Sequence, residues 1–254
     1  MAVASIEHRI DIRIASSSQD VMYGWLYSSP RFTELKLDVY ANCFNEMGYT
    51  GLVDWHQQQE DWKSAIKYTR QLKNVDPDQV GLFGTSFSGG HVIQLAAGDK
   101  RLKAAISQCP FPSGWASTRC TGISVAPKLA ALGVLDTLFG SDERPITVSL
   151  IGKPGEAALM NAPDGNVPAR LALKLPFLRP GSYTSRVDCP ILFGICGKSS
   201  VTPADPTLAY TKTAPKGVIK WYDVGHFEIY YGEAFEKAIQ TYKRFLQECL
   251  PVNG

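Results

Sequence analysis

The chain has 254 residues, of which 44% are apolar and 20% are charged, and its formal net charge at pH 7 is +2. This length and composition suffice for a substantial core, so we expect one α/β domain over residues 1–254 that includes a cap insertion. The nearly balanced charge, without a block of like charges, argues against nucleic acid and anionic membranes as partners. No stretch resembles a secretory signal or a membrane span, so a cytoplasmic protein that acts on a small molecule is expected.

The first half-buried strand is expected over residues 6–14, where isoleucines alternate with charged residues. Residues 21–27 repeat the alternation, which predicts an antiparallel hairpin. The pattern from Leu37 to Met47 has a helical period and predicts a helix, followed by a short strand from Tyr49 to Val53. A second helix is expected around residues 62–72.

Strands and helices alternate in the rest of the chain. Strands are expected over residues 80–85, 102–109, 191–196 and 218–222, with helices after 86, near 204–213 and at the C-terminal end. This order is typical of a mainly parallel sheet with helices on both faces. The final helix is expected to bury Phe235, Ile239, Tyr242 and Leu246. Residues 111–185, rich in Pro, Gly and Ser with one helical stretch at 126–139, are interpreted as an inserted cap.

The most informative segment, residues 80–97, reads Val-Gly-Leu-Phe-Gly-Thr-Ser-Phe-Ser-Gly-Gly-His-Val-Ile-Gln-Leu-Ala-Ala. An apolar run, a serine among small residues and a helical pattern form the sequence of a nucleophile elbow. Gly84 and Ser88 are small enough to approach each other across so sharp a turn. We therefore expect Ser86 to expose its hydroxyl as a nucleophile, with the backbone amide of Phe87 directed at a substrate carbonyl oxygen.

Two alternatives to this interpretation stay open at the level of the sequence. The pattern is Gly-x-Ser-x-Ser rather than the commoner Gly-x-Ser-x-Gly, and a turn of this kind also caps a helix in proteins without catalytic activity. Ser88 is a rival nucleophile, although its place in the first helical turn favours Ser86.

The general base is expected in a loop at the carboxyl edge of the sheet. His226 follows the strand at 218–222 and fits the chain order of serine, acid and histidine in this fold class. A Gly-His turn can also be merely structural. We interpret His91, on the helix after Ser86, as a packed side chain, and expect no functional role for His56.

The six cysteines show no Cys-x-x-Cys spacing and no histidine at metal-ligand spacing. We interpret them as reduced thiols, mostly in the core, and expect no metal or other cofactor. Cys109 and Cys196 lie at the ends of expected strands, where a buried apolar role is favoured over a role near the site.

Several segments together resemble an α/β-hydrolase family that contains fungal polyketide transferases and thiohydrolases of secondary-metabolite pathways, with bacterial esterase-like relatives. They are the elbow, Cys-Pro-Ile-Leu-Phe-Gly-Ile-Cys-Gly-Lys with the following Val-Thr-Pro, Ala-Pro-Lys-Gly-Val-Ile-Lys-Trp-Tyr-Asp, and Gly-His-Phe-Glu-Ile-Tyr. The resemblance runs from about Val21 to the C-terminus. It implies acyl transfer from an ester or thioester to water or an alcohol, with Ser86 as nucleophile and His226 as base. A carrier-bound acyl group is among the candidate substrates that it implies.

The chain departs from the family pattern in two places. Ser199 stands where the family has the acid of the triad, and by analogy with serine proteases an uncharged replacement costs roughly 10⁴ in rate. Asp205 is a candidate substitute, with helix capping as its alternative role, whereas Asp223 is too close along the strand.

The second departure is an absence: the family's central strand and oxyanion loop before the first helix have no visible counterpart, which predicts a sheet lacking one central strand. Either the chain is shortened or its hydrolytic power is reduced. A binding protein without turnover and a non-hydrolytic cyclase are therefore the competing functions.

Overall fold

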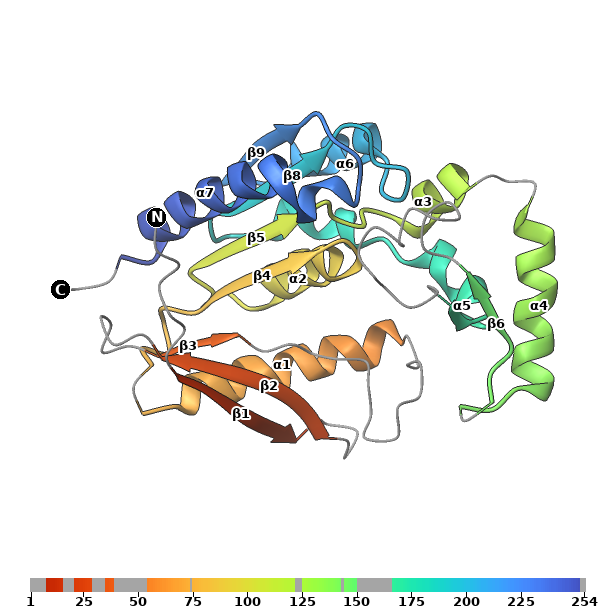
Figure 1. Cartoon of the computed structure of the whole chain (residues 1–254), viewed down its shortest axis with the longest axis horizontal. Coiled ribbons are helices and arrows are strands. Elements are labelled where there is room, and N and C mark those ends of the chain that lie inside the picture. The colour runs from red at the N-terminus through yellow and green to blue at the C-terminus, as the bar shows by residue number, and fades with distance from the viewer. Residues whose placement is uncertain are drawn as a thin grey trace. The chain divides into compact units, whose positions relative to one another are not determined.

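A computed structural model describes residues 8–15, 21–28, 35–38, 54–73, 75–121, 125–142, 144–149 and 166–251 (Figure 1). The chain divides into two compact units, residues 1–80 and 81–254. The first unit contains strands β1 (His8–Ala15), β2 (Val21–Ser28) and β3 (Leu35–Asp38) and helix α1 (Trp55–Gln71).

The strands of the first unit form an antiparallel sheet in the order β1-β2-β3, which confirms the predicted hairpin. Ile12 and Ile14 are buried and pack with Ala65 of α1, because alternate residues of a strand point to one face. The helix begins where Asp54 Oδ1 accepts hydrogen bonds from the amides of His56 at 2.9 Å and Gln57 at 3.1 Å. Such a cap satisfies amides that have no partner inside the helix.

The helix predicted to start at Leu37 is wrong in its first residues, because Leu35–Asp38 form strand β3. Leu35 and Leu37 alternate with Lys36 and Asp38, a period that suits a strand as well as the start of a helix. Antiparallel pairing with β2 supplies the partner that decides between them. The remainder of that helix and the predicted strand Tyr49–Val53 lie outside the described residues, and the predicted absence of a central strand stays a prediction.

The second unit contains a parallel sheet in the order β4-β5-β8-β9, which confirms the α/β architecture. Its elements are β4 (Gly81–Thr85), α2 (Phe87–Gly98), β5 (Ala104–Gln108), α3 (Gly114–Thr121), α4 (Ala126–Phe139), β6 (Thr147–Ser149), β7 (Asn166–Pro168), α5 (Leu171–Lys174), the 3-10 helices η3 (Leu175–Phe177) and η4 (Pro180–Arg186), β8 (Ile191–Cys196), α6 (Ala204–Thr211), β9 (Gly217–Tyr222), the 3-10 helix η5 (Glu228–Tyr230) and α7 (Gly232–Cys249).

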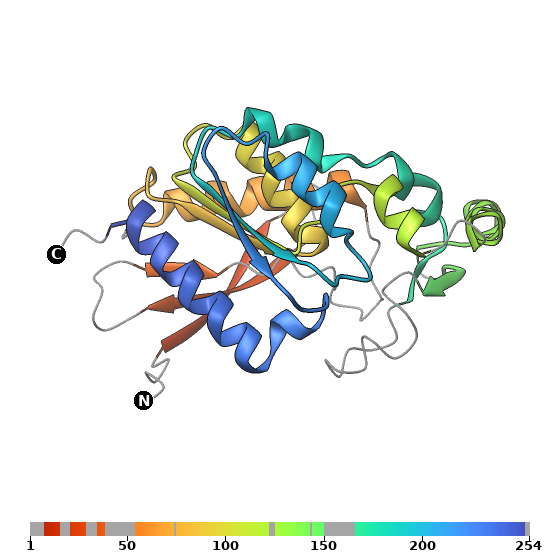
Figure 2. The same cartoon turned by 90° about the horizontal axis from the view of Figure 1, so that it is seen from above.

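Helices cover both faces of this sheet, with α7 on one face and α2 and α6 on the other (Figure 2). All residues of β5 and β8 are buried, as expected for central strands of a parallel sheet. The face under α7 packs Ile106 and Leu192 against Tyr242 and Phe245. The prediction for α7 was wrong at Phe235, which is 38% exposed, because the buried face is centred on Ala238, Tyr242 and Phe245.

The segment between β5 and β8 carries α3, α4, the β6-β7 hairpin and α5, in the region predicted as a cap. Its two ends are joined by hydrogen bonds from Gly114 N to Leu178 O and from Gly181 N to Pro112 O, both 2.8 Å long. Thr184, at the end of the segment, is only 1% exposed. The last turn of this segment therefore packs as part of the main body, whereas the cap assignment stays a prediction.

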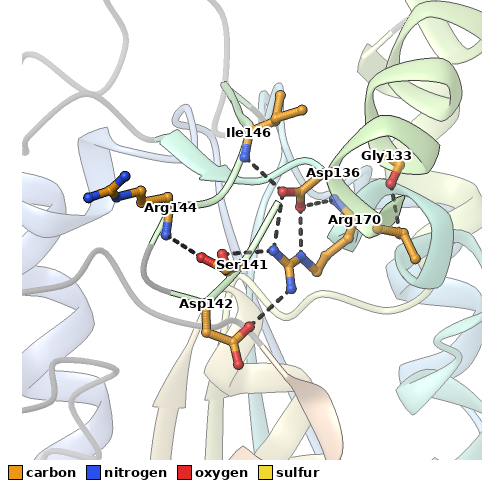
Figure 3. Close-up of polar contacts among 8 residues, drawn as sticks. Gly133, Asp136, Ser141, Asp142, Arg144, Ile146 and Arg170 are labelled. Atoms are coloured by element: carbon orange, nitrogen blue, oxygen red, sulfur yellow. Dashed lines mark hydrogen bonds and ion pairs between the residues drawn. The ribbon is translucent and has the colours of Figure 1, made fainter. Parts of the chain in front are cut away.

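Inside this segment, a buried carboxylate links α4 to the start of α5 (Figure 3). Asp136 is fully buried, and its Oδ2 accepts from Arg170 Nε at 2.7 Å and Arg170 N at 3.0 Å. Its Oδ1 accepts from Ile146 N at 2.7 Å. Hydrogen bonds from Arg170 hold the pKa of Asp136 below its usual value, so the pair is ionised. A Cβ at Gly140 would collide with this carboxylate, so the turn after α4 requires glycine.

Candidate active site

Ser86 lies at the sharp turn between β4 and α2, as the sequence predicts for a nucleophile elbow. Its φ of 55° and ψ of −120° are outside the regions that residues with a side chain favour, at a cost of about 1–3 kcal/mol. A Cβ at Gly84 would collide with the backbone oxygen of Ser88, so the chain can only turn this tightly with glycine there. The strained backbone turns the Ser86 side chain out of the strand-to-helix junction.

The backbone of this turn is fixed from both sides. Ser86 N donates to Gln108 O at 2.9 Å, and Ser86 O accepts from Phe111 N at 2.9 Å. The preceding residue, Thr85, is held through Oγ1, which lies 3.0 Å from Gln108 Nε2 and 2.7 Å from the hydroxyl of Tyr230. These bonds keep the hydroxyl of Ser86 in one place because they fix the residues on either side of it.

His226 reaches Ser86 from the loop that follows β9. The pairing of β8 and β9 continues past their ends, with Gly197 N donating to Tyr222 O at 2.8 Å and Lys198 N to Val224 O at 3.0 Å. His226 is 3% exposed, and its Nε2 lies 3.0 Å from Ser86 Oγ. Two residues that are 140 positions apart are thus within hydrogen-bonding distance, which is the geometry that a serine nucleophile and its base require.

The other ring nitrogen of His226 faces two hydroxyls. Ser199 Oγ lies 3.2 Å and Thr202 Oγ1 3.3 Å from Nδ1. From the sequence, Ser199 is interpreted as the loss of the family's acid, and no role is predicted for Thr202. The available signal was the run Ser-Ser-Val-Thr directly after the strand Ile191–Cys196, since a loop at the carboxyl edge of a parallel sheet borders the site.

The structure does not bring the predicted substitute acid to the ring. Asp205 is exposed in the first turn of α6, and its carboxylate is not among these partners of His226 Nδ1. The N-cap of α6 is Pro203 and no side chain forms a capping hydrogen bond there, so Asp205 does not cap the helix and only places a negative charge in its first turn. Asp223 forms an exposed ion pair with Lys198 at 3.0 Å, in agreement with its exclusion.

Phe87 is the first residue of α2, so its backbone N–H lies at the positive end of the helix dipole beside Ser86. Its ring is held by an edge contact with His91 at 5.2 Å and a tilted contact with Phe111 at 5.1 Å between ring centroids. Burial lowers the pKa of His91 to about 3, so this side chain is neutral and packed, as predicted. Ser88, the rival nucleophile, is the second residue of α2. The serine that contacts His226 Nε2 is Ser86.

Cys109 and Cys196 form a buried thiol pair below the site, with their Sγ atoms 2.8 Å apart. The hydrogen bond from Cys196, together with burial, raises the pKa of Cys109 well above its usual value. Both belong to the apolar cluster under α7, as their interpretation as core thiols requires. Over the described ranges, no three His, Cys, Asp or Glu side chains are grouped as metal ligands would be.

The comparisons with known proteins agree with this architecture. The profile of a family described as X-Pro dipeptidyl-peptidase (S15 family) matches residues 38–149. The quorum-quenching protein AidA of Acinetobacter baumannii is 42% identical over 220 residues, which cover 79% of this chain and 72% of that protein. The chain belongs to the α/β-hydrolase family.

One further sequence relative and one solved structure of the same fold accompany this assignment. The thiohydrolase aneE of Aspergillus aculeatus is 28% identical over 224 residues, covering 78% of this chain and 70% of that protein. The crystal structure of the α/β-hydrolase GrgF from Penicillium sp. sh18 has a TM-score of 0.76 at 16% identity, covering 96% of this chain and 99% of the other. The chain is thus an enzyme related to ester- and thioester-cleaving hydrolases and acyltransferases. None of the helices in the described ranges has both the length and the apolar character that crossing a bilayer demands.

Proposed function

We propose that the protein is a serine-dependent acyl hydrolase or acyltransferase that acts on a small ester or thioester. The observation that carries this proposal is the 3.0 Å contact between Ser86 Oγ and His226 Nε2 at a strained elbow. A serine hydroxyl becomes a useful nucleophile when a neighbouring base accepts its proton as it attacks. The rigid backbone on both sides of Ser86 supports the same role.

In the proposed reaction, Ser86 Oγ attacks the acyl carbon while His226 Nε2 takes the hydroxyl proton. The negative charge on the carbonyl oxygen is stabilised by the N–H of Phe87 at the start of α2. His226 then gives its proton to the departing thiol or alcohol, which leaves an ester on Ser86. Water or an acceptor alcohol attacks this ester and gives its proton to His226, which passes the proton to Ser86 Oγ as the bond between Ser86 and the acyl group breaks. The acyl product leaves, and both residues return to their starting states.

The substrate class is supported by the names of the relatives. The name of the thiohydrolase aneE supports a thioester substrate. That the acyl group is carrier-bound and belongs to a secondary-metabolite pathway is part of the proposal and follows from the family resemblance. The quorum-quenching relative adds small bacterial signal molecules to the candidates. Esters and thioesters are both acyl compounds that the proposed Ser86 chemistry can cleave.

A fluorophosphonate probe tests the nucleophile directly, because the oxygen of an activated serine displaces its fluoride and forms a phosphonate ester. We expect one label on the wild type, located by peptide mass at Ser86, and none on Ser86→Ala. Ser88→Ala is the matched control and keeps the label. A folded wild type without label, or a label that persists in Ser86→Ala, contradicts the proposal.

A second candidate function is a hydrolase-like protein that binds an acyl metabolite with little or no turnover. Ser199 favours it, because a neutral hydroxyl beside His226 does not stabilise the imidazolium as a carboxylate does. Turnover of p-nitrophenyl esters by the wild type but not by Ser86→Ala removes this candidate. A product of unchanged mass from a pathway intermediate would instead indicate the cyclase.

A further inference from the structure

The two hydroxyls beside His226 Nδ1 form a connected group, in which Thr202 is buried and Ser199 is half-buried. Ser199 Oγ and Thr202 Oγ1 lie 3.0 Å apart, and each lies within 3.3 Å of Nδ1. Thr202 is only 4% exposed and His226 only 3%. Buried polar atoms keep their hydrogen-bond partners because bulk water cannot replace them, so the direction of each bond can be worked out from the donors present.

The reaction fixes the tautomer that His226 needs. Nε2 must carry no proton if it is to accept one from Ser86, so the proton of the neutral ring must be on Nδ1. An Nδ1–H group requires an acceptor. A carboxylate can only accept, whereas a hydroxyl can also donate. A hydroxyl that donates to Nδ1 would place the ring proton on Nε2, and Nε2 could then no longer accept the proton of Ser86.

Backbone amides assign the roles of the two hydroxyls. Ser199 Oγ already accepts from Thr202 N at 3.0 Å and from Val201 N at 3.4 Å. A hydroxyl oxygen has two lone pairs, so Ser199 is left with its own O–H to donate, and Thr202 Oγ1 at 3.0 Å is placed to accept it. Thr202 Oγ1 has a second lone pair, which can accept from Nδ1 at 3.3 Å.

We propose that Thr202 is the positioning residue of the active site: its hydroxyl accepts the hydrogen bond from His226 Nδ1–H, and Ser199 orients that hydroxyl. This inference rests on the proposed roles of Ser86 and His226. A neutral acceptor keeps the productive tautomer but adds no negative charge to stabilise the imidazolium. The site therefore keeps the geometry of a catalytic triad, with a lower kcat than a site that has a carboxylate beside Nδ1.

Substitutions at Thr202 separate a hydroxyl effect from a packing effect. We expect Thr202→Val, which keeps the side-chain shape, to lower kcat for a p-nitrophenyl ester about 100-fold with little change in KM. Thr202→Ser restores the hydroxyl and should stay within about 3-fold of the wild type. Ser182→Ala removes an exposed hydroxyl of η4 and serves as the control without effect.

Ser199→Asp tests the missing charge. Its carboxylate can accept the same backbone amides and also the Nδ1–H, so we expect kcat to rise about 10-fold or more. The carboxylate also favours the protonated ring, so the acidic limb of the kcat/KM profile should move to higher pH by about one unit. A purely structural role of residue 199 would leave this limb in place.

Nitrogen-15 NMR of the imidazole provides a readout independent of turnover, with His226→Gln used to assign the signals. We expect the proton of the neutral ring on Nδ1 in the wild type and in Thr202→Ser, and a shift toward Nε2 in Thr202→Val. Identical tautomers and equal kcat in Thr202→Val and Thr202→Ser overturn the inference. Absence of Ser86-dependent labelling in every variant overturns the proposed function instead, while the NMR result still decides the role of Thr202.

Discussion

Two buried polar clusters of the second unit hold a nitrogen-bearing side chain in opposite ways. In the segment between β5 and β8, Asp136 holds Arg170 with a fully buried carboxylate, and Ile146 N donates to the same group (Figure 3). At the candidate active site, the Nδ1 side of His226 faces the neutral hydroxyls of Ser199 and Thr202.

The difference corresponds to what each nitrogen group has to do. A guanidinium keeps its charge at every relevant pH, so a fixed carboxylate with several donors is its stable partner. An imidazole that serves as a base must gain and lose a proton in each cycle. Hydroxyl partners direct the ring without holding it in the charged form. The first cluster therefore serves stability, and the second, in the proposed reaction, orients a group that changes its protonation state.

The largest effect is expected at the base itself. His226→Gln removes the proton acceptor of Ser86 and should lower kcat by roughly 10⁴ or more, as the loss of a triad member does. The free energy of unfolding should change by much less than the activation free energy that corresponds to this loss of kcat. Ester turnover and urea denaturation of the same preparation check both statements, and a variant with nearly normal turnover would show that another group serves as base.

The converse is expected for Asp136→Asn. The substitution removes the buried charged partner of Arg170, which keeps its exposed ion pair with Asp142 at 3.0 Å. Because Arg170 is partly exposed and retains this second partner, we expect a loss of about 3 kcal/mol, at the low end for buried pairs. Chemical denaturation measures the loss, and hydrogen exchange should locate it in α4. Fluorophosphonate labelling of Ser86 should persist. Unchanged stability would mean that the buried pair contributes nothing beyond what neutral hydrogen bonds supply.

A third buried nitrogen group, His91, extends the comparison to pH. Burial lowers the pKa of His91 to about 3, below the unfolded value near 6.5. The unfolded chain therefore binds a proton first, so stability should be level above pH 6.5 and fall as pH decreases from there toward 3. The slope contributed by this residue is at most about 1.4 kcal/mol per pH unit. Urea denaturation at pH 7 and pH 5 should show the fall, and His91→Gln should reduce it.

The smallest effect is expected for Asp205→Asn. Its carboxylate is exposed in the first turn of α6, and the hydroxyls of Ser199 and Thr202 occupy the positions beside Nδ1. Turnover should stay within about 2-fold of the wild type, because an exposed carboxylate in a helical first turn contributes only a few tenths of a kcal/mol to the helix. A loss of 100-fold or more would restore Asp205 as the acid.

The sequence predicted those parts of the molecule that have a local signature. The turn at Ser86 needs small neighbours and an apolar strand before it, and these requirements are visible in consecutive residues. His226 was identifiable because few histidines exist and only one follows a strand late in the chain. The parallel sheet followed from the alternation of strands and helices.

Features that depend on distant partners could not be predicted in this way. Asp136 and Arg170 are 34 residues apart, and neither lies in a pattern that distinguishes it from a surface charge. Thr202 acquires its role from the position of its hydroxyl relative to His226 and Ser199. Strand β3 was missed because four alternating residues also fit a helix, and only the pairing with β2 resolves the ambiguity.

At Ser86, the backbone conformation that stabilises the fold best and the side chain that the proposed reaction needs call for different residues. Glycine adopts a φ of 55° without penalty, whereas serine and alanine do not. We therefore expect the free energy of unfolding of Ser86→Gly to exceed that of Ser86→Ala by about 1 kcal/mol, measured by urea denaturation. Neither variant carries the proposed nucleophile. Glycine at position 86 would give the more stable fold, so the serine in this turn lowers the free energy of unfolding in exchange for a hydroxyl at the candidate active site.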